Sequence, residues 1–398
     1  MRGHVLAAAM LVLCVESAHA QADDPDFAAW RDRFSQRAIA QGRTEHTLAA
    51  LFEGVTPDAD VLAIDRRTSS GYTPAIWDYL DAQVSEARIT SGRTLLREAG
   101  PLLQPISAAY GVEPAIIVAV WGMESRYGAV DLRYDARRSL ATLAYAGRPS
   151  RKAYFERQLG ALAEMLESGH VRAGVVPASW DGGLGQAQFM PDSFLESAVD
   201  WDRDGLIDIW GNRGDVLASI AHYLQVHGYV AGAPTLIEAR VDRRLSADVA
   251  ESVRTTTQWE SAGVHALEGP VNDASARLYR PAGAGGPAFL IYDNFAALKS
   301  YNGVQRYALA AAMLAHAIEG RPRALDWPRP ADGLTREELM EFQGLLAANG
   351  YNAGNADGVM GERTWLAARA FAADVGVAPP NYPTKALLEA LRARRTTP

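Results

Sequence analysis

Helical periodicity is the feature of this sequence that most constrains its fold. Between Phe27 and about Gly320, apolar residues recur three and four positions apart in many segments, and a glycine often follows where a helix would end. Short β-like runs, such as TLIEARV and AFLIY, occur only near Gly232 to Leu290. The sequence therefore predicts a mainly α fold with additional small β elements.

The length and composition indicate more than one folded unit. A chain of 398 residues is too long for one ordinary compact domain, and 48% hydrophobic with 22% charged residues is enough to fill a sizeable core. The segment GRPRALDWPRPADG contains three prolines and is typical of a linker. We therefore expect a large unit at 21–320, a linker at 321–333 and a three-helix unit at 334–398.

The N-terminus has the pattern of an export signal. A basic start at Arg2 precedes an apolar stretch from Val5 to Val15, and small residues stand at Ala18 and Ala20. The pattern predicts a signal peptide at 1–20 that is cleaved after Ala20. A retained membrane anchor is the alternative, although the apolar stretch is short for a bilayer span.

Cysteine content and charge narrow the chemistry further. Cys14 is the only cysteine and would leave with the signal, and the bulky Leu13 before it argues against lipid attachment. The net charge is −8, and Lys/Arg runs are limited to the short RARRTTP tail, which argues against nucleic acid as a partner. No second stretch is apolar enough for a membrane span, so none is expected after signal cleavage.

One acidic residue interrupts the apolar run PAIIVAVWGMESRYG. Pro114 suits the first turn of a helix, and Ile116, Val120 and Glu124 then follow one another on one helical face. A carboxyl group in apolar surroundings keeps its proton to higher pH, which is what a general acid needs near neutrality. The alternative is a structural glutamate that pairs with Arg126 or another cation.

Two segments combine aromatic and amide side chains, a combination that suits a neutral polar polymer such as a glycan. The first, SWDGGLGQAQFMP, begins at Ser179, and the second, YDNFAALKSYNGVQRYA, begins at Tyr292. A tight turn with core aromatics is the alternative for each residue. The candidate sugar-binding residues chosen from their side chains are Gln186, Gln188, Phe189, Tyr292, Asn294, Tyr301 and Asn302.

The segment DWDRDGLIDIWG has the spacing of a calcium-binding loop, with aspartates at the first, third, fifth and ninth positions and a glycine at the sixth. The twelfth position, normally a glutamate, is Gly211. The alternative is a loop ordered by its own side-chain hydrogen bonds. The candidate ligands are Asp200, Asp202, Asp204, the Leu206 carbonyl and Asp208.

The chain resembles the lytic murein transglycosylases of the B type, which are periplasmic enzymes that cleave peptidoglycan strands. The matching segments, in order, are PAIWDYLD, VWGMESRYG, SWDGGLGQAQFMPDSF, AVDWDRDGLIDIWGN, GGPAFLIYDNF and YNGVQRYALA. The resemblance implies a lysozyme-like helical catalytic domain with additional helical and small β elements. It also implies that Glu124 is the single catalytic glutamate and that Ser179, Gln188, Phe189, Tyr301 and Asn302 contact the sugar.

The same resemblance implies the reaction. Glu124 would protonate the glycosidic oxygen between N-acetylmuramic acid and N-acetylglucosamine, and the muramoyl C6 hydroxyl would then close a 1,6-anhydro ring without water. No cofactor would be required, and calcium would be structural. A hydrolytic muramidase and a non-catalytic scaffold that binds peptidoglycan remain alternatives.

The C-terminal segment resembles the three-helix peptidoglycan-binding domain, with FQGLLAANGY and DGVMGERT as the matching motifs. The usual Phe-Gln of the middle helix is Phe371-Ala372 here. A helical bundle without a binding role is the alternative. The resemblance implies that this unit binds glycan strands.

Overall fold

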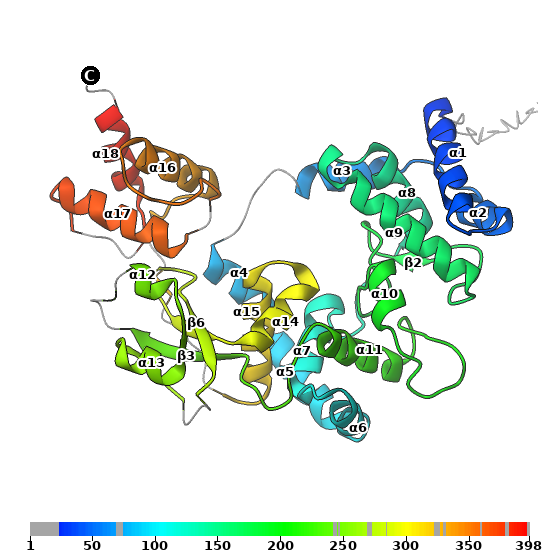
Figure 1. Cartoon of the computed structure of the whole chain (residues 1–398), viewed down its shortest axis with the longest axis horizontal. Helices are drawn as coiled ribbons and strands as arrows, with labels where there is room; N and C mark the ends of the chain where they lie inside the picture. The colour runs from blue at the N-terminus through cyan, green and yellow to red at the C-terminus, as the bar shows by residue number, and fades with distance from the viewer. Residues whose placement is uncertain are drawn as a thin grey trace, which may run out of the picture.

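Figure 1 shows the chain as a computed structural model in which residues 24–68, 75–241, 245, 247–268, 273–283, 285–321, 327–328, 332–358, 360–378 and 382–395 are described. These residues form helices α1 to α18 and strands β1 to β7, which confirms the prediction of a mainly α fold with small β elements. The predicted signal peptide at 1–20, with Cys14, lies outside the described residues, as does much of the predicted linker at 321–333.

One group of helices lies on the right in Figure 1. Helix α9 packs against α8, α10 and α2, and α3 packs against α8. Asp24 begins the group because its carboxylate accepts the first free N–H groups of α1. The helices are α1 (Pro25–Ala40), α2 (Glu45–Phe52), α3 (Ala59–Thr68), α8 (Ala136–Ala146), α9 (Pro149–Glu167) and α10 (Pro191–Ser197).

A second group surrounds α7 (Pro114–Ser125) at the centre of the molecule. Helix α7 packs against α5, α6, α11 and α15. Among the described helices none alone has the length and apolarity of a membrane span, and the pair α6 and α7, which does when joined, is bent by 106°. The other helices are α4 (Ile76–Gln83), α5 (Glu86–Glu98), α6 (Gly100–Tyr110), α11 (Arg213–Val226), α14 (Asp293–Asn302) and α15 (Gln305–Ile318).

The β-like segments form a five-stranded antiparallel sheet with the order β4-β6-β7-β3-β5. Strand β3 pairs with β7 so that Leu236 faces Ile291, and one face of the sheet packs around the buried Trp259 of α13. A separate two-stranded ribbon pairs β1 with β2. The elements are β1 (Tyr134–Asp135), β2 (Pro177–Ala178), β3 (Leu236–Val241), α12 (Ala247–Ala250), β4 (Val253–Thr255), α13 (Thr256–Ser261), β5 (Val264–Ala266), β6 (Ser275–Tyr279) and β7 (Ala288–Ile291).

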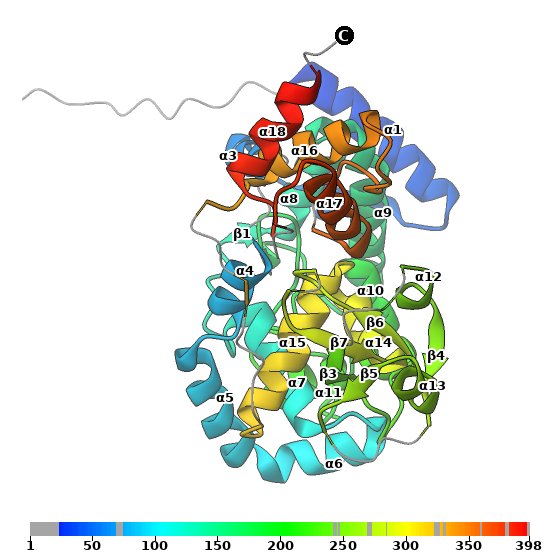
Figure 2. The ribbon, with the colours of Figure 1, turned by 90° about the vertical axis from the view of Figure 1, so that its left-hand side faces the viewer.

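The C-terminal unit consists of α16 (Arg336–Ala348), α17 (Glu362–Asp374) and α18 (Lys385–Arg395), the three helices that the sequence predicts. It packs against the larger unit, and Figures 1 and 2 both show it beyond the sheet, next to α12. The Tyr382 ring lies 5.1 Å from the Trp77 ring, between centroids. A side chain at Gly283 would collide with Trp365, because its Cβ would lie 2.7 Å from the indole. The two units are therefore docked rather than merely tethered.

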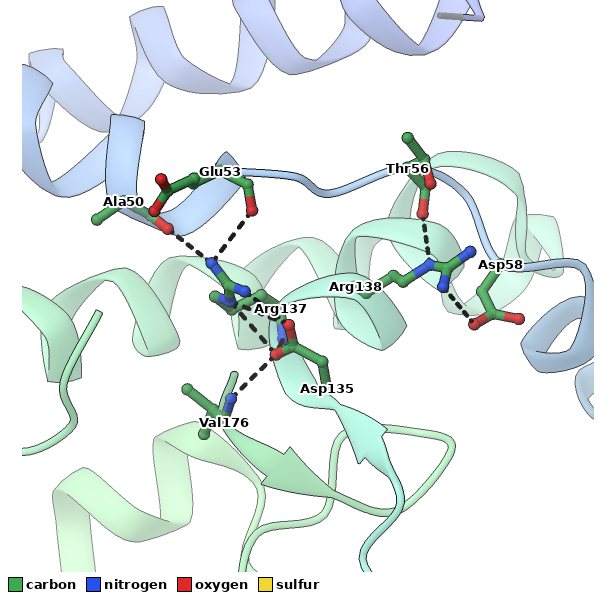
Figure 3. Close-up of polar contacts among 8 residues, drawn as sticks. All are labelled: Ala50, Glu53, Thr56, Asp58, Asp135, Arg137, Arg138 and Val176. Carbon is green, nitrogen blue, oxygen red and sulfur yellow. Dashed lines mark hydrogen bonds and ion pairs between the residues drawn. The ribbon is translucent and has the colours of Figure 1, made fainter. Parts of the chain in front are cut away.

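A polar network fixes the ribbon β1–β2 to the helices around it (Figure 3). Arg137 forms an ion pair with Asp135 at 2.8 Å and donates to the carbonyl of Ala50 at 2.9 Å. Asp135 also accepts the N–H of Val176 at 3.2 Å. Arg137 and Asp135 are largely buried, so both charges depend on these partners and the ribbon is held in one position.

Candidate active site

The site is built around the C-terminal end of α7. Pro114 stands at the first turn, as predicted, but the helix is buried all round rather than along one stripe. The residues from Ala115 to Gly122 are all buried, whereas Glu124 is only partly so. A partly buried carboxyl group thus stands at the end of an otherwise apolar helix.

An unusual turn fixes the direction in which α7 ends. Arg126 and Tyr127 both have left-handed backbone conformations, with φ of 51° and 62°, which are uncommon outside glycine. Tyr127 folds back on Gly122, where a Cβ would lie 2.5 Å from the phenol ring, and donates to the carbonyl of Arg88 at 2.8 Å. This close packing holds the turn in place directly after Glu124.

The partner of Glu124 is a tyrosine. The buried hydroxyl of Tyr307, on the first turn of α15, donates a short hydrogen bond to Glu124 Oε1. Among the ion pairs of the described residues none includes Glu124, so the alternative of a pair with Arg126 is not what the structure shows. The carboxyl group is held by a neutral donor.

The surroundings of Glu124 change its acidity. Burial raises the pKa from 4.5 to about 7, the Tyr307 hydrogen bond opposes this rise, and the negative charge of Asp181 adds to it. Desolvation and a like charge both disfavour the ionised form of an acid. A carboxyl group with this pKa can both give and take a proton near neutral pH.

Aromatic rings lie beneath this carboxyl group. The Tyr301 ring stacks on Tyr307 with 6.2 Å between centroids, and its hydroxyl donates to the carbonyl of Ala187 at 2.8 Å. Phe189 packs 5.9 Å from Tyr301 and 5.5 Å from Tyr223, and only 2% of it is exposed. Phe189, predicted to contact sugar, therefore lies below the surface and supports Tyr301.

The glycine-rich segment places two predicted sugar-binding side chains together. Ser179 Oγ donates to Asp181 at 2.9 Å and accepts the N–H of Gly183 at 2.9 Å. A Cβ at Gly183 would lie 2.7 Å from Ser179 Oγ and 3.0 Å from Gln188 Oε1, so both side chains approach this one glycine. Gln188 has a φ of 52° and donates to the carbonyl of Gly185 at 2.7 Å, which orients its amide.

Gln186 holds parts of the site together. Its side-chain oxygen accepts the indole N–H of Trp121 at 3.0 Å, and its nitrogen donates to the carbonyl of Trp210 at 2.7 Å. The amide packs so closely on Gly128 that a Cβ there would lie 2.5 Å from it. These bonds occupy both ends of the amide, so the structure gives Gln186 a supporting position between α7 and the acidic loop.

Tyr292 and Asn294 lie away from Glu124 and serve the fold. Asn294 is completely buried and bonds to the backbone of Val230 and Ala233 at 2.8 to 2.9 Å. Tyr292 is 5% exposed and belongs to the core of the sheet. This corrects the expectation that both side chains face a glycan. The prediction was wrong because an amide next to aromatic residues is equally suited to a buried position, where the amide bonds to backbone groups of another segment. Asn302 is exposed at the end of α14.

The sequence did not identify Tyr307 and Asp181 as the neighbours of Glu124, although Tyr307 is one of the aromatic residues of the second segment. Both lie inside the segments chosen for sugar contacts, but nothing in their spacing marks them as partners of Glu124. Tyr307 is 183 positions from Glu124, and the packing of α15 on α7 brings the two side chains together. Asp181 lies close enough to Glu124 for its negative charge to raise the pKa of that carboxyl group.

The first half of the acidic loop has the geometry expected of a calcium-binding loop. Oxygens of Asp200, Asp202 and Asp204 lie within 4.8 Å of one another, close enough to share a cation. Gly205 has a φ of 94°, the sharp turn expected at the sixth position. The aspartates also accept backbone N–H groups of the loop, such as that of Gly205 to Asp200 at 2.9 Å.

The second half of the loop differs from the predicted ligand set. Asp208 turns toward its own chain, where one oxygen accepts the N–H groups of Trp210 at 2.9 Å and Gly211 at 2.8 Å. The buried Asp215, which the sequence analysis did not identify, accepts the N–H of Trp201 at 2.9 Å and of Asp208 at 2.7 Å. Burial raises the pKa of Asp215. The donor set fits calcium at three aspartates, with Asp208 committed elsewhere.

Comparisons with known proteins agree with this geometry. The model of the transglycosylase SLT domain family matches residues 26–316. Membrane-bound lytic murein transglycosylase B of Escherichia coli K12 is 26% identical over 284 residues, which cover 71% of this chain and 77% of that protein.

Solved structures are similar over most of the chain. SltB3 from Pseudomonas aeruginosa, in complex with NAG-anhNAM-pentapeptide, has a TM-score of 0.81 at 38% identity and covers 92% of this chain and 99% of that chain. The Escherichia coli lytic transglycosylase Slt35, in complex with calcium, has a TM-score of 0.63 at 25% identity, with 74% and 93% covered. The match with SltB3 is long enough to include the C-terminal helices.

Proposed function

The chain belongs to the transglycosylase SLT domain family and is a lytic transglycosylase, and we propose that it cleaves the β-1,4 bond between N-acetylmuramic acid and N-acetylglucosamine in peptidoglycan. The observation that carries this proposal is the Glu124 carboxyl group, whose pKa is raised to about 7 at the end of a buried helix. The solved SltB3 complexes, which hold NAG-NAM-pentapeptide and its anhydro counterpart, support the substrate class.

The proposed reaction uses Glu124 twice. The protonated carboxyl group gives its proton to the oxygen that leaves muramoyl C1, and the C1–O bond breaks. The carboxylate then takes the proton of the C6 hydroxyl of the same sugar while that oxygen bonds to C1. Protons balance, no water is consumed, and an intramolecular nucleophile is effective because it is already positioned.

The neighbours of Glu124 tune this proton transfer. Tyr307 orients the carboxylate and stabilises its ionised form, whereas Asp181 favours the protonated form. We assign the muramoyl N-acetyl group to Ser179 and Gln188, since their side chains converge on Gly183 beside Asp181. Tyr301 and the exposed Asn302 are proposed to contact the sugar from the other side.

Mass spectrometry of digested sacculi tests the reaction. Fragments ending in 1,6-anhydromuramic acid are expected. Fragments with reducing muramic acid ends would instead identify a muramidase, in which water attacks C1. No release of fragments from intact sacculi would identify a scaffold without catalysis.

Calcium is proposed as a structural ion held by Asp200, Asp202 and Asp204, with the Leu206 carbonyl as a further ligand. The cation would neutralise carboxylates that repel one another, and it would take no part in proton transfer. The calcium named in the Slt35 complex supports the assignment. Because Asp208 bonds to Trp210 and Gly211 and position twelve lacks a carboxylate, binding should be weak, with a dissociation constant of about 10⁻⁴ to 10⁻³ M.

The C-terminal unit is proposed to bind peptidoglycan. A cavity of about 600 Å³ is lined by both units, by Arg306 from the larger unit and Leu334 from the C-terminal unit among others. Arg306 directly precedes Tyr307, the partner of Glu124.

Deleting residues 334–398 should weaken sedimentation with sacculi, and unchanged sedimentation would refute the binding role. Because Trp77 and Gly283 pack against this unit, the deletion should also lower the melting temperature, contrary to a simple tethered domain.

Export to the periplasm is proposed from the N-terminal sequence. Periplasmic fractionation followed by N-terminal sequencing should give a chain that begins at Gln21. A chain that keeps residues 1–20 and sediments with membranes would show that the segment is an anchor.

A further inference from the structure

A group of arginines lines an open pocket between α3 and the ribbon β1–β2. The pocket has a volume of about 690 Å³. Arg66, Arg67 and Arg133 contribute three positive charges, and Asp60 contributes one negative charge. Three of the seven residues that line the pocket are therefore arginines, in a chain whose net charge is −8.

The pocket is next to the segment that carries the site residues. Tyr134, which lines it, pairs with Ala178, and Ala178 directly precedes Ser179. The guanidinium of Arg133 lies 5.4 Å from the centre of the Tyr134 ring, a cation–π contact that orients it. Arg133 is therefore attached, through one strand pair, to the residues assigned to the muramoyl group.

Helix α3, the other wall, is firmly anchored. Asp65 is 1% exposed and binds Arg148 twice, through the guanidinium at 2.9 Å and the backbone N–H at 3.1 Å. The N–H of Asp58, just before α3, donates to Thr142 at 2.9 Å, and Arg138 bonds to the same connection (Figure 3). The arginines on α3 are thus presented from a rigid base.

The chemistry of the pocket fits an anion rather than a neutral sugar. Guanidinium groups bind carboxylates with paired hydrogen bonds, whereas sugar hydroxyls offer no charge to match. A peptide that is joined to muramic acid through its amino end carries a carboxylate at its other end. We propose that Arg66, Arg67 and Arg133 bind a carboxylate of the peptide stem carried by the glycan strand, an inference that rests on the proposed function.

The test compares two soluble glycan fragments with the same stems, one with free stem carboxylates and one with those carboxylates converted to amides. The wild-type kcat/KM should be about fivefold higher for the free acid, the upper range for an exposed ion pair. Arg133→Glu and Arg67→Glu should each reduce this ratio toward one. Raising the salt concentration should reduce it in the wild type.

Arg97→Glu is the matched control, because Arg97 is also an exposed arginine but lies on α5, away from α3 in Figures 1 and 2. It should keep the wild-type ratio. A wild-type ratio near one, or an equal fall in all three variants, would overturn the proposal. Absence of anhydro product from both fragments would instead overturn the proposed function, so the two failures are distinguishable.

Discussion

Glu124 and the aspartates of the 200–208 loop are carboxylates in opposite surroundings. Glu124 ends a buried helix, its one hydrogen-bond partner in the described structure is a tyrosine, and its pKa is raised to about 7. The loop aspartates lie near the surface, close to one another, and accept several backbone N–H groups. Burial favours the protonated form of an acid, and this is what raises the pKa of Glu124.

The difference shows how one residue type serves two purposes. A carboxyl group that keeps its proton near pH 7 can act as a general acid, and carboxylates whose oxygens lie within 4.8 Å of one another can share a cation. Neither property is visible in the identity of the residue. Both follow from which backbone and side-chain groups the fold places around it.

Glu124→Gln should have the largest effect on activity. The amide is nearly isosteric but cannot give a proton, so kcat should fall by about 10³-fold or more. Release of anhydro fragments from sacculi measures it, and an unchanged melting temperature at pH 4, where Glu124 is protonated in both the folded and the unfolded wild type, serves as the folding control. Appreciable residual kcat would remove Glu124 from the catalytic role.

The same substitution should stabilise the protein at alkaline pH. Because the folded pKa of Glu124 is about 7, above its ordinary 4.5, ionisation costs the folded state free energy. This free-energy cost is absent below pH 4.5, grows as the pH rises from 4.5 to about 7, and reaches its full value above pH 7. Denaturant unfolding should show Glu124→Gln more stable than the wild type by about 2 kcal/mol at pH 8, after allowance for partial exposure, but not at pH 4. Equal differences at both pH values would contradict the raised pKa.

Tyr307→Phe and Asp181→Asn should shift the pH profile in opposite directions. The Tyr307 hydrogen bond lowers the pKa of Glu124, so Tyr307→Phe should raise this pKa. The Asp181 charge raises the pKa of Glu124, so Asp181→Asn should lower it. The alkaline limb of kcat/KM, where Glu124 loses its proton, should move with it. Tyr307→Phe should also lower kcat by about tenfold, since a hydrogen bond to a charged group is lost. If the alkaline limb moved in the same direction in both variants, these assignments would be refuted.

Calcium should have the smallest effect, and on stability alone. A few millimolar should add about 1 kcal/mol, or roughly 2 °C in melting temperature. Asp204→Ala should abolish this rise, whereas Asp32→Ala, which removes an exposed aspartate on α1, should keep it. Activity at low temperature should survive chelation. Its immediate loss would assign the metal a larger role.

Local features of the site could be predicted from the sequence because local rules control them. Pro114 begins α7, and Gly205 adopts the positive φ of the acidic loop. The partners of Glu124 could not be predicted. Tyr307 meets Glu124 only because α15 packs on α7, and that packing depends on the whole helical core.

The residues mistaken for a sugar surface show the same limit. Asn294 is surrounded by backbone groups of the segment Val230 to Ala233, which lies 61 or more positions away in sequence. An amide beside aromatics fits a glycan or a buried turn equally well. Only the fold decides between them, because only the fold determines which side chains reach solvent.

Direct titration of the Glu124 carboxyl group tests the central claim, that a single, partly buried glutamate has a pKa near neutral pH. Infrared difference spectra between the wild type and Glu124→Gln, recorded from pH 4 to 9, isolate the protonated C=O band of this group. The band should disappear with a midpoint of about pH 7. A midpoint near the ordinary value of 4.5 would contradict the claim, because the group would then hold no proton to give at neutral pH.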